Sequence, residues 1–220
     1  MSNTLEASLR ELRLGGMLGG FQELADQARR ESYSYEKYLV ELVERERQAR
    51  YETRVGRLSR QSRLPAEKTL ESFDRGRLPA KVNSQLSRLL EGQFVERCEN
   101  VLAFGNPGSG KSHLLCALGH ELIRRGHALL FRSCALLVQD LLRAKRDLEL
   151  ARALKKLRHY RVVIADDIGY VQQSREEMEV LFSFLADRYE RGTVMVTSNL
   201  AFSAWEKIFR ESNTSECHTG

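Results

Sequence analysis

The stretch GNPGSGKS, residues 105–112, follows the apolar run Val101 to Phe104 and precedes a segment of helical character. Its pattern GxxxxGKS predicts a phosphate-binding loop, because glycines let backbone N–H groups face a polyphosphate at a helix N-terminus. We expect Lys111 to reach the β- and γ-phosphates and Ser112 to bind Mg²⁺. An ordinary Gly/Pro turn is the alternative. The residues expected to line the nucleotide are Gly105, Asn106, Pro107, Gly108, Ser109, Gly110, Lys111, Ser112 and His113.

A second short apolar run, Val162 to Ala165, ends in two carboxylates, Asp166 and Asp167. A continuous apolar strand is typical of a parallel sheet covered on both faces, and ligands bind at the carboxyl edge of such sheets. We expect Asp166 to hold Mg²⁺ through water and Asp167 to orient or deprotonate the attacking water. An Asp-rich turn after a strand is the alternative, which the phosphate loop disfavours.

A third apolar run, Thr193 to Val196, is followed by Thr197-Ser198-Asn199. Such residues often only begin a turn. As the third feature in order, Asn199 is expected to contact the γ-phosphate or the attacking water. The expected catalytic residues are therefore Lys111, Asp167 and Asn199.

The composition of the 220 residues suits one domain of ordinary size with a small second module. A hydrophobic fraction of 42% is enough for a core, and no apolar run is long enough to span a bilayer. The first twenty residues do not resemble a secretory signal. The four cysteines have no CxxC spacing, so we expect free thiols and a cytoplasmic protein. Because no run could span a bilayer, we expect no membrane partner.

His113, Cys116 and His120 share one face of the helix expected after the phosphate loop. Three potential ligands on one face suggest a metal site. However, no fourth ligand is evident, and this helix must also pack on the sheet. We therefore favour core or surface roles for these side chains.

An arginine-rich stretch runs from Arg45 to Arg63 with only two acidic residues, and its spacing predicts a basic stripe on one helix face. Such a stripe matches a polyanion, and double-stranded DNA is the expected partner. A solvated face paired with neighbouring acids is the alternative, but too few acids lie nearby in the sequence. The candidate DNA-binding residues are Arg47, Arg50, Arg54 and Arg57.

The periodicity predicts an N-terminal helical module for DNA binding and assembly over residues 1–70. Its first helices are expected to be short and broken by Gly15-Gly16 and Gly19-Gly20, and a longer one is expected from Tyr35 to about Ser59. Residues 71–210 alternate between strands and helices, which predicts a three-layer parallel α/β sheet. Residues 211–220 are expected to be a disordered tail.

The motifs extend beyond the phosphate loop, and in this order the chain resembles the IstB-like ATP-binding helpers of insertion-sequence transposases. These are AAA+ ATPases related to bacterial helicase loaders. The resemblance runs from Leu12 to Phe209. The shared segments are Leu14-Gly15-Gly16-Met17, Val43 to Glu46, Phe73-Asp74, Glu99 to Leu102, the phosphate loop, Ala117 to His120, Asp166 to Tyr170, Ser174 to Glu177, Arg188 to Arg191 and Thr197 to Leu200, with Trp205 and Phe209.

The resemblance implies a P-loop AAA+ fold that uses ATP and Mg²⁺, assembles as a homo-oligomer on double-stranded DNA and delivers a transposase. It assigns nucleotide and Mg²⁺ binding to Lys111 and Ser112, the acidic pair to Asp166 and Asp167, and the sensor to Asn199. Residues 210–220 depart from the family pattern, which continues with a lid helix, a final strand and a late arginine. The resemblance places that strand beside Val101 to Phe104, so we expect an open apolar edge, an incomplete AAA+ domain and a truncated copy.

Three functions are compatible with the sequence. The first is an ATP-hydrolysing helper of transposition that recruits a transposase. The second is an ATPase that loads a replicative helicase in DNA replication. The third is a non-catalytic remnant that still binds ATP or DNA.

Overall fold

A computed structural model describes residues 2–168 and 174–199 of the chain. It divides the chain into two compact units, Met1–Arg57 and Leu58–Gly220. The division lies inside the long helix α3 (Tyr35–Ser62), earlier than the boundary expected near residue 70. The last turn of α3 belongs with the second unit because Leu58 and Ser62 are buried there.

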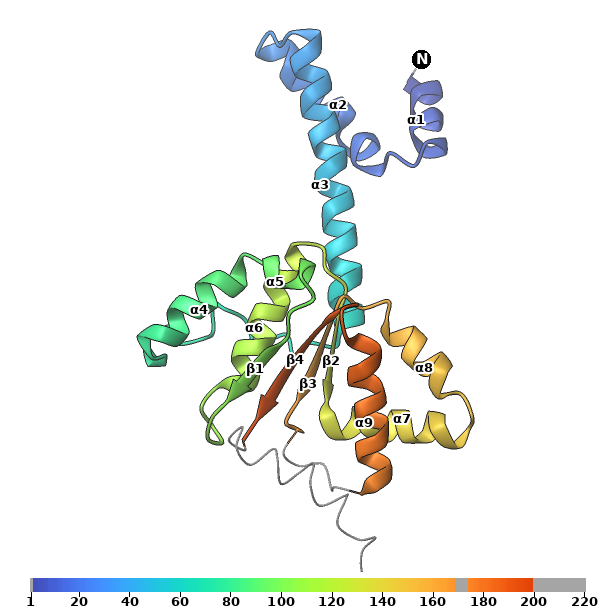
Figure 1. The fold of residues 1–220 in the computed structure, drawn as a ribbon. Helices are drawn as coiled ribbons and strands as arrows, with labels where there is room; N and C mark the ends of the chain where they lie inside the picture. Colours follow the sequence, from blue (N-terminus) through green and yellow to red (C-terminus); the bar gives the residue numbers. More distant parts are fainter. Residues whose placement is uncertain (1, 169–173, 200–220) are drawn as a thin grey trace, which may run out of the picture. The chain divides into compact units, whose positions relative to one another are not determined.

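The first unit is helical and contains α1 (Ser2–Glu11), α2 (Gly15–Arg30) and most of α3 (Figure 1). Apolar residues at helical spacing bury one face of each helix and form a small core. The residues of this core are Leu9, Phe21, Leu24 and Leu42.

The expectation that the glycine pairs break the first helices is wrong. Both pairs lie inside α2, and the break falls at Leu12–Leu14, where Arg13 has a φ of 55°. Close packing explains Gly16, because a Cβ there would lie 2.7 Å from the Arg45 carbonyl oxygen. Gly16 therefore allows α2 to approach the backbone of α3.

A buried carboxylate, that of Glu46, fixes the start of α2. It accepts hydrogen bonds from the amides of Gly16 (2.7 Å) and Met17 (3.1 Å) and from Arg50 Nε (2.6 Å). Burial opposes ionisation of Glu46, but these three donors outweigh it, so its pKa lies below the ordinary value. The Glu46 carboxylate thus caps α2 from a neighbouring helix.

The second unit contains a four-stranded parallel sheet with the order β1-β4-β3-β2. The predicted α/β fold is confirmed, and the strand that precedes Asn199 lies between the phosphate-loop strand and the acidic strand. The register pairs Phe104 with Ser198 and Ser133 with Asp166, so the strands end at one common edge. The strands are β1 (Val101–Phe104), β2 (Leu129–Ser133), β3 (Val162–Asp166) and β4 (Thr193–Ser198).

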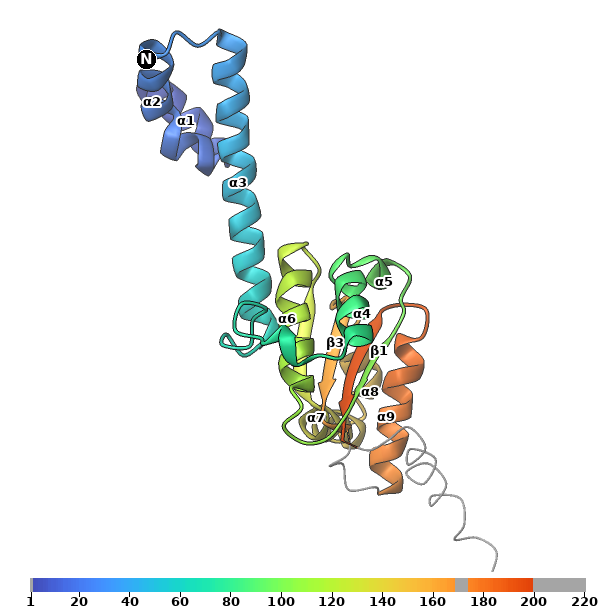
Figure 2. The same cartoon turned by 90° about the vertical axis from the view of Figure 1, so that its left-hand side faces the viewer.

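Helices cover both faces of the sheet and give the predicted three layers (Figure 2). One face carries α4 and α6, and the other carries α7, α8 and α9, whose apolar residues form the main core with β3 and β4. The described helices of this unit after α3 are η1 (Arg75–Arg77), α4 (Ala80–Leu90), α5 (Gln93–Glu96), α6 (Lys111–Arg124), α7 (Cys134–Arg146), α8 (Leu150–Leu157) and α9 (Arg175–Arg188).

The buried guanidinium of Arg188 connects the segments at the amino-terminal ends of β3 and β4. It donates to four carbonyl oxygens, those of Leu157, Tyr160, Arg161 and Thr193. The helix α9 ends at Arg188, because Tyr189 leaves the helical conformation and Glu190 has a φ of 56°.

Within the described residues, β1 pairs only with β4. The side chains of Leu102 and Phe104 are 45% and 38% exposed. The expectations of a missing final strand and lid and of a disordered tail concern residues 200–220, outside the described part of the chain.

Candidate functional site

The phosphate loop lies between β1 and α6, as predicted. Gly108 and Gly110 have φ angles of 77° and 87°, in the left-handed region where glycine avoids the clash of a Cβ. Gly110 is the N-cap of α6, so the free amides of the first helical turn face the loop. This backbone arrangement is suited to binding anions.

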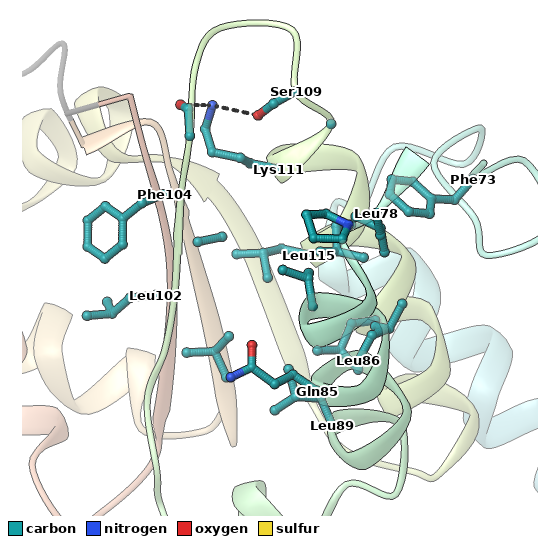
Figure 3. A pocket seen from close by; sticks show the side chains of 18 residues that line it. Phe73, Leu78, Gln85, Leu86, Leu89, Leu102, Phe104, Ser109, Lys111 and Leu115 are labelled. Carbon is teal, nitrogen blue, oxygen red and sulfur yellow. Dashed lines mark hydrogen bonds between the residues drawn. The ribbon is translucent and has the colours of Figure 1, made fainter. Parts of the chain in front are cut away.

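Lys111 folds back over the loop (Figure 3). Its ammonium donates to the carbonyl oxygens of Gly105 (2.7 Å) and Asn106 (2.8 Å) and lies 3.5 Å from Ser109 Oγ. The cation is therefore held inside the loop by neutral acceptors. A phosphate oxygen is a stronger acceptor than a carbonyl, so a bound polyphosphate can replace these contacts.

The acidic pair and the end of β4 form one hydrogen-bonded network. Thr197 Oγ1 donates to Asp166 Oδ1 at 2.6 Å and accepts from the Asp167 amide at 2.7 Å. Asn199 Nδ2 donates to Asp167 Oδ1 at 3.2 Å. Thr197 was not assigned a role from the sequence, although its position at the end of a central strand next to the acidic pair was a usable signal.

Asp167 has features typical of a strained functional residue. Its φ of 64° lies in the left-handed region. Burial, and then the neighbouring Asp166 carboxylate, raise the pKa of Asp167 above its ordinary value, while Lys111 opposes the shift. A carboxylate of raised basicity accepts a proton more readily than an ordinary aspartate.

A cavity of about 380 Å³ brings both halves of the predicted site together. Asp166 borders this cavity through its hydrogen bond with Thr197. Lys68 also lines the cavity, although it was not expected there from the sequence. The Ser112 hydroxyl and the Asp166 carboxylate are hard oxygen ligands, so these residues fit Mg²⁺. The cavity is lined by Lys68, Pro107, Gly108, Gly110, Lys111, Ser112, His113, Asp167, Thr197 and Asn199.

A second cavity, of about 420 Å³, lies on the other side of the loop between α4, β1 and α6 (Figure 3). Its wall is mainly apolar and includes Phe73, Leu78, Leu86 and Leu115. Gly110 and Lys111 border both cavities, so the two spaces meet at the start of α6.

The arginine stripe of α3 is more neutralised than the sequence indicated. Arg47 pairs with Glu44 at 2.6 Å, and Arg50 pairs with Glu46 at 2.6 Å while donating to the Arg13 carbonyl oxygen. The view that too few acids lie nearby is therefore wrong for these two arginines, because helical spacing of three and four brings the acids into reach. Arg54 and Arg57 line a surface groove beside Arg50. Contact of any of the four with DNA stays a prediction.

Comparison with known proteins supports the phosphate site. Residues 7–217 match the family described as IstB-like ATP binding protein. A protein of Sinorhizobium fredii, named for an insertion sequence and for ATP binding, is 37% identical over 202 residues, which cover 91% of this chain and 68% of that protein.

Solved structures with the same fold include AMPPCP-bound DnaA from Aquifex aeolicus, with a TM-score of 0.55 and 17% identity over 67% of this chain. The chain spans 49% of that DnaA. The DnaC helicase loader gives a TM-score of 0.54 and 18% identity over 66% of this chain and 85% of its own. These likenesses show the P-loop fold of AAA+ ATPases.

The described helices include none that is long and apolar enough to cross a membrane. The family match, the phosphate loop and the shared fold agree with one another. The chain belongs to the family of IstB-like ATP-binding proteins.

Proposed function

We propose that the protein hydrolyses ATP at the cavity between the phosphate loop and the ends of β3 and β4. The observation that carries this proposal is that Lys111, Ser112 and Asp167 line one cavity, whereas they come from distant parts of the sequence. Lys111 and the loop amides bind the β- and γ-phosphates. Bound Mg²⁺, held by Ser112 and by Asp166 through water, supplies charge neutralisation.

Asp167 accepts a proton from the attacking water, whose oxygen bonds to the γ-phosphorus as the bond to the β,γ-bridging oxygen breaks and ADP leaves. Its raised pKa and its hydrogen bond from Asn199 support this role. Thr197 holds Asp166 and the Asp167 amide in place. Asn199 is positioned to respond to the loss of the γ-phosphate.

The purine base occupies the apolar cavity beside the loop. Its volume of about 420 Å³ lies in the range of small-molecule pockets, and its wall suits a flat apolar ring. Because Gly110 and Lys111 border both cavities, one nucleotide can place its phosphates in one and its base in the other.

ATP binding serves an assembly function in the transposition of an insertion sequence. The family and the insertion-sequence relatives support this, and the arginines of α3 supply a basic surface for double-stranded DNA. The protein forms homo-oligomers on DNA in the cytoplasm and recruits a transposase. Loading of a replicative helicase is the alternative partner function.

Steady-state ATP hydrolysis, measured with and without duplex DNA, tests the proposal. We expect turnover that DNA stimulates and that Lys111→Ala abolishes. A well-folded protein without turnover under either condition would be a non-catalytic remnant. Pull-down with purified transposase and helicase separates the two partner functions, because recovery of the helicase alone contradicts the role in transposition.

A further inference from the structure

The segment that follows α3 is fixed along one face of α6 (Figure 2). His120 Nε2 donates to the Pro65 carbonyl oxygen at 3.0 Å, and His113 Nε2 donates to the Thr69 carbonyl oxygen at 3.1 Å. The two histidines lie seven residues apart on the helix face that the sequence marked as a possible metal site. The structure gives them another role, as clamps for residues 65–69.

Apolar contacts hold the segment at both of its ends. The Phe73 ring packs edge-on against His113, with centroids 5.1 Å apart, and lies next to Gly110 of the phosphate loop. Leu64 packs against Gly119, where an added Cβ would lie 3.2 Å from Leu64 Cδ1. The backbone on either side of Lys68 is therefore anchored to the helix that begins at the phosphate loop.

Lys68 lies between these anchors and lines the same cavity as Lys111, Ser112 and Asp167. Its side chain is partly buried, and within the described residues its ammonium makes no hydrogen bond or ion pair. Burial raises the pKa of the Cys116 thiol to about 12, and the charge of Lys68 opposes that shift, which places the ammonium close to α6. A partly buried cation without an anion is unfavourable unless a ligand supplies one.

The charges of the cavity also call for a second cation. Lys111 shares the cavity with the Asp167 carboxylate, and Asp166 borders the cavity through Thr197. A nucleoside triphosphate adds several negative charges to these two. One lysine and one divalent cation leave that group of anions only partly balanced.

We propose that Lys68 is a second phosphate-binding cation, which the segment after α3 delivers to the polyphosphate of the nucleotide. This inference rests on the proposed nucleotide site and adds a ligand from outside the phosphate loop. Because a direct ion pair links the segment to the phosphates, nucleotide binding and docking of residues 64–73 strengthen each other by the same factor.

Calorimetric titration of the full chain with Mg·ATP tests this assignment. Lys68→Met removes the charge and keeps the length of the side chain, so we expect the Kd for ATP to rise about tenfold or more and its salt dependence to weaken. The melting temperature without nucleotide should not fall, because the change removes a charge that has no anion within the described residues. Lys155→Met, which removes an exposed charge on α8 of the same unit, is the matched control. It should leave the Kd for ATP and its salt dependence unchanged.

A Kd within about twofold of the wild type for Lys68→Met would overturn the inference. A raised Kd with unchanged salt dependence would also overturn it, since Lys68 would then only support the fold of the cavity. Lys111→Ala separates this failure from failure of the proposed site, because a phosphate site requires that variant to lose ATP binding whatever Lys68 does.

Hydrogen exchange gives a second measurement. In the wild type, saturating Mg·ATP should slow amide exchange in residues 64–73, and Lys68→Met at saturating Mg·ATP should lose most of that protection. Equal protection in the two proteins would contradict a direct link between the segment and the phosphates.

Discussion

Two groups of charged residues in this protein differ in how fully their charges are paired. At the junction of α2 and α3, Glu46 is 8% exposed and meets two amides and the Arg50 guanidinium. At the candidate phosphate site, Asp167 has a raised pKa, and the hydrogen-bond acceptors of Lys111 among residues 2–168 and 174–199 are all neutral. The first group is complete without a ligand and maintains the fold. The second group is not balanced in this way, as the proposed nucleotide site requires.

The largest expected effect tests the incomplete group. Asp167→Asn keeps the shape of the side chain and removes its basicity, so ATP hydrolysis should fall by about 10²–10⁴-fold while ATP binding is retained. Single-turnover hydrolysis and nucleotide titration measure the two quantities separately. Loss of binding together with hydrolysis would show that Asp167 holds the site together rather than acting on water.

The complete group should respond through stability instead. Glu46→Gln places an amide that can donate toward the amides of Gly16 and Met17 and removes the ion pair with Arg50. We expect the free energy of unfolding of the N-terminal unit to fall by about 2 kcal/mol, measured by urea denaturation. Glu44→Gln breaks the exposed pair with Arg47 and is the control, with a change below about 0.5 kcal/mol. Equal effects of the two changes would mean that burial of Glu46 has no energetic consequence.

The arginine stripe is divided by position. Arg54 and Arg57 border the groove, and Arg47 does not. We expect Arg54→Ala with Arg57→Ala to weaken binding of duplex DNA about tenfold and to reduce its salt dependence, and Arg47→Ala to have a smaller effect. Fluorescence anisotropy at several salt concentrations measures both. If Arg47→Ala alone weakens binding as much as the double change, a position at the groove does not decide which arginines contact DNA.

The sequence predicted the α/β sheet and the position of the glycine-rich loop between a strand and a helix, because both depend on local patterns of apolar runs and glycine spacing. It did not predict the role of Gly16, which is set by the distance to Arg45 on another helix. The cap provided by Glu46 lies 30 residues from the amide of Gly16, and its partners follow no motif. Lys68 was missed for a similar reason, since only the contacts of the segment with α6 bring it to the cavity.

The smallest expected effect concerns the stability of the nucleotide-free protein. Because the pKa of Asp167 is raised above its ordinary value of 3.8, the folded state binds this proton more tightly than the unfolded chain does. Stability from this group is therefore lost as the pH rises from that value through the raised pKa. Asp167→Asn resembles the protonated form, so its melting temperature should exceed that of the wild type by about a degree or two at pH 7.

That difference should disappear as the pH falls below the ordinary value for aspartate, where the wild type is itself protonated. Differential scanning calorimetry across this range measures it, with Asp147→Asn, an exposed change at the end of α7, as the control. A wild type that is more stable than Asp167→Asn at pH 7 would mean that the carboxylate is already fully compensated without nucleotide. The charges of the candidate phosphate site would then be as fully paired as those of the Glu46 cap. A residue selected for reaction with a ligand should instead cost the folded protein some stability when the ligand is absent.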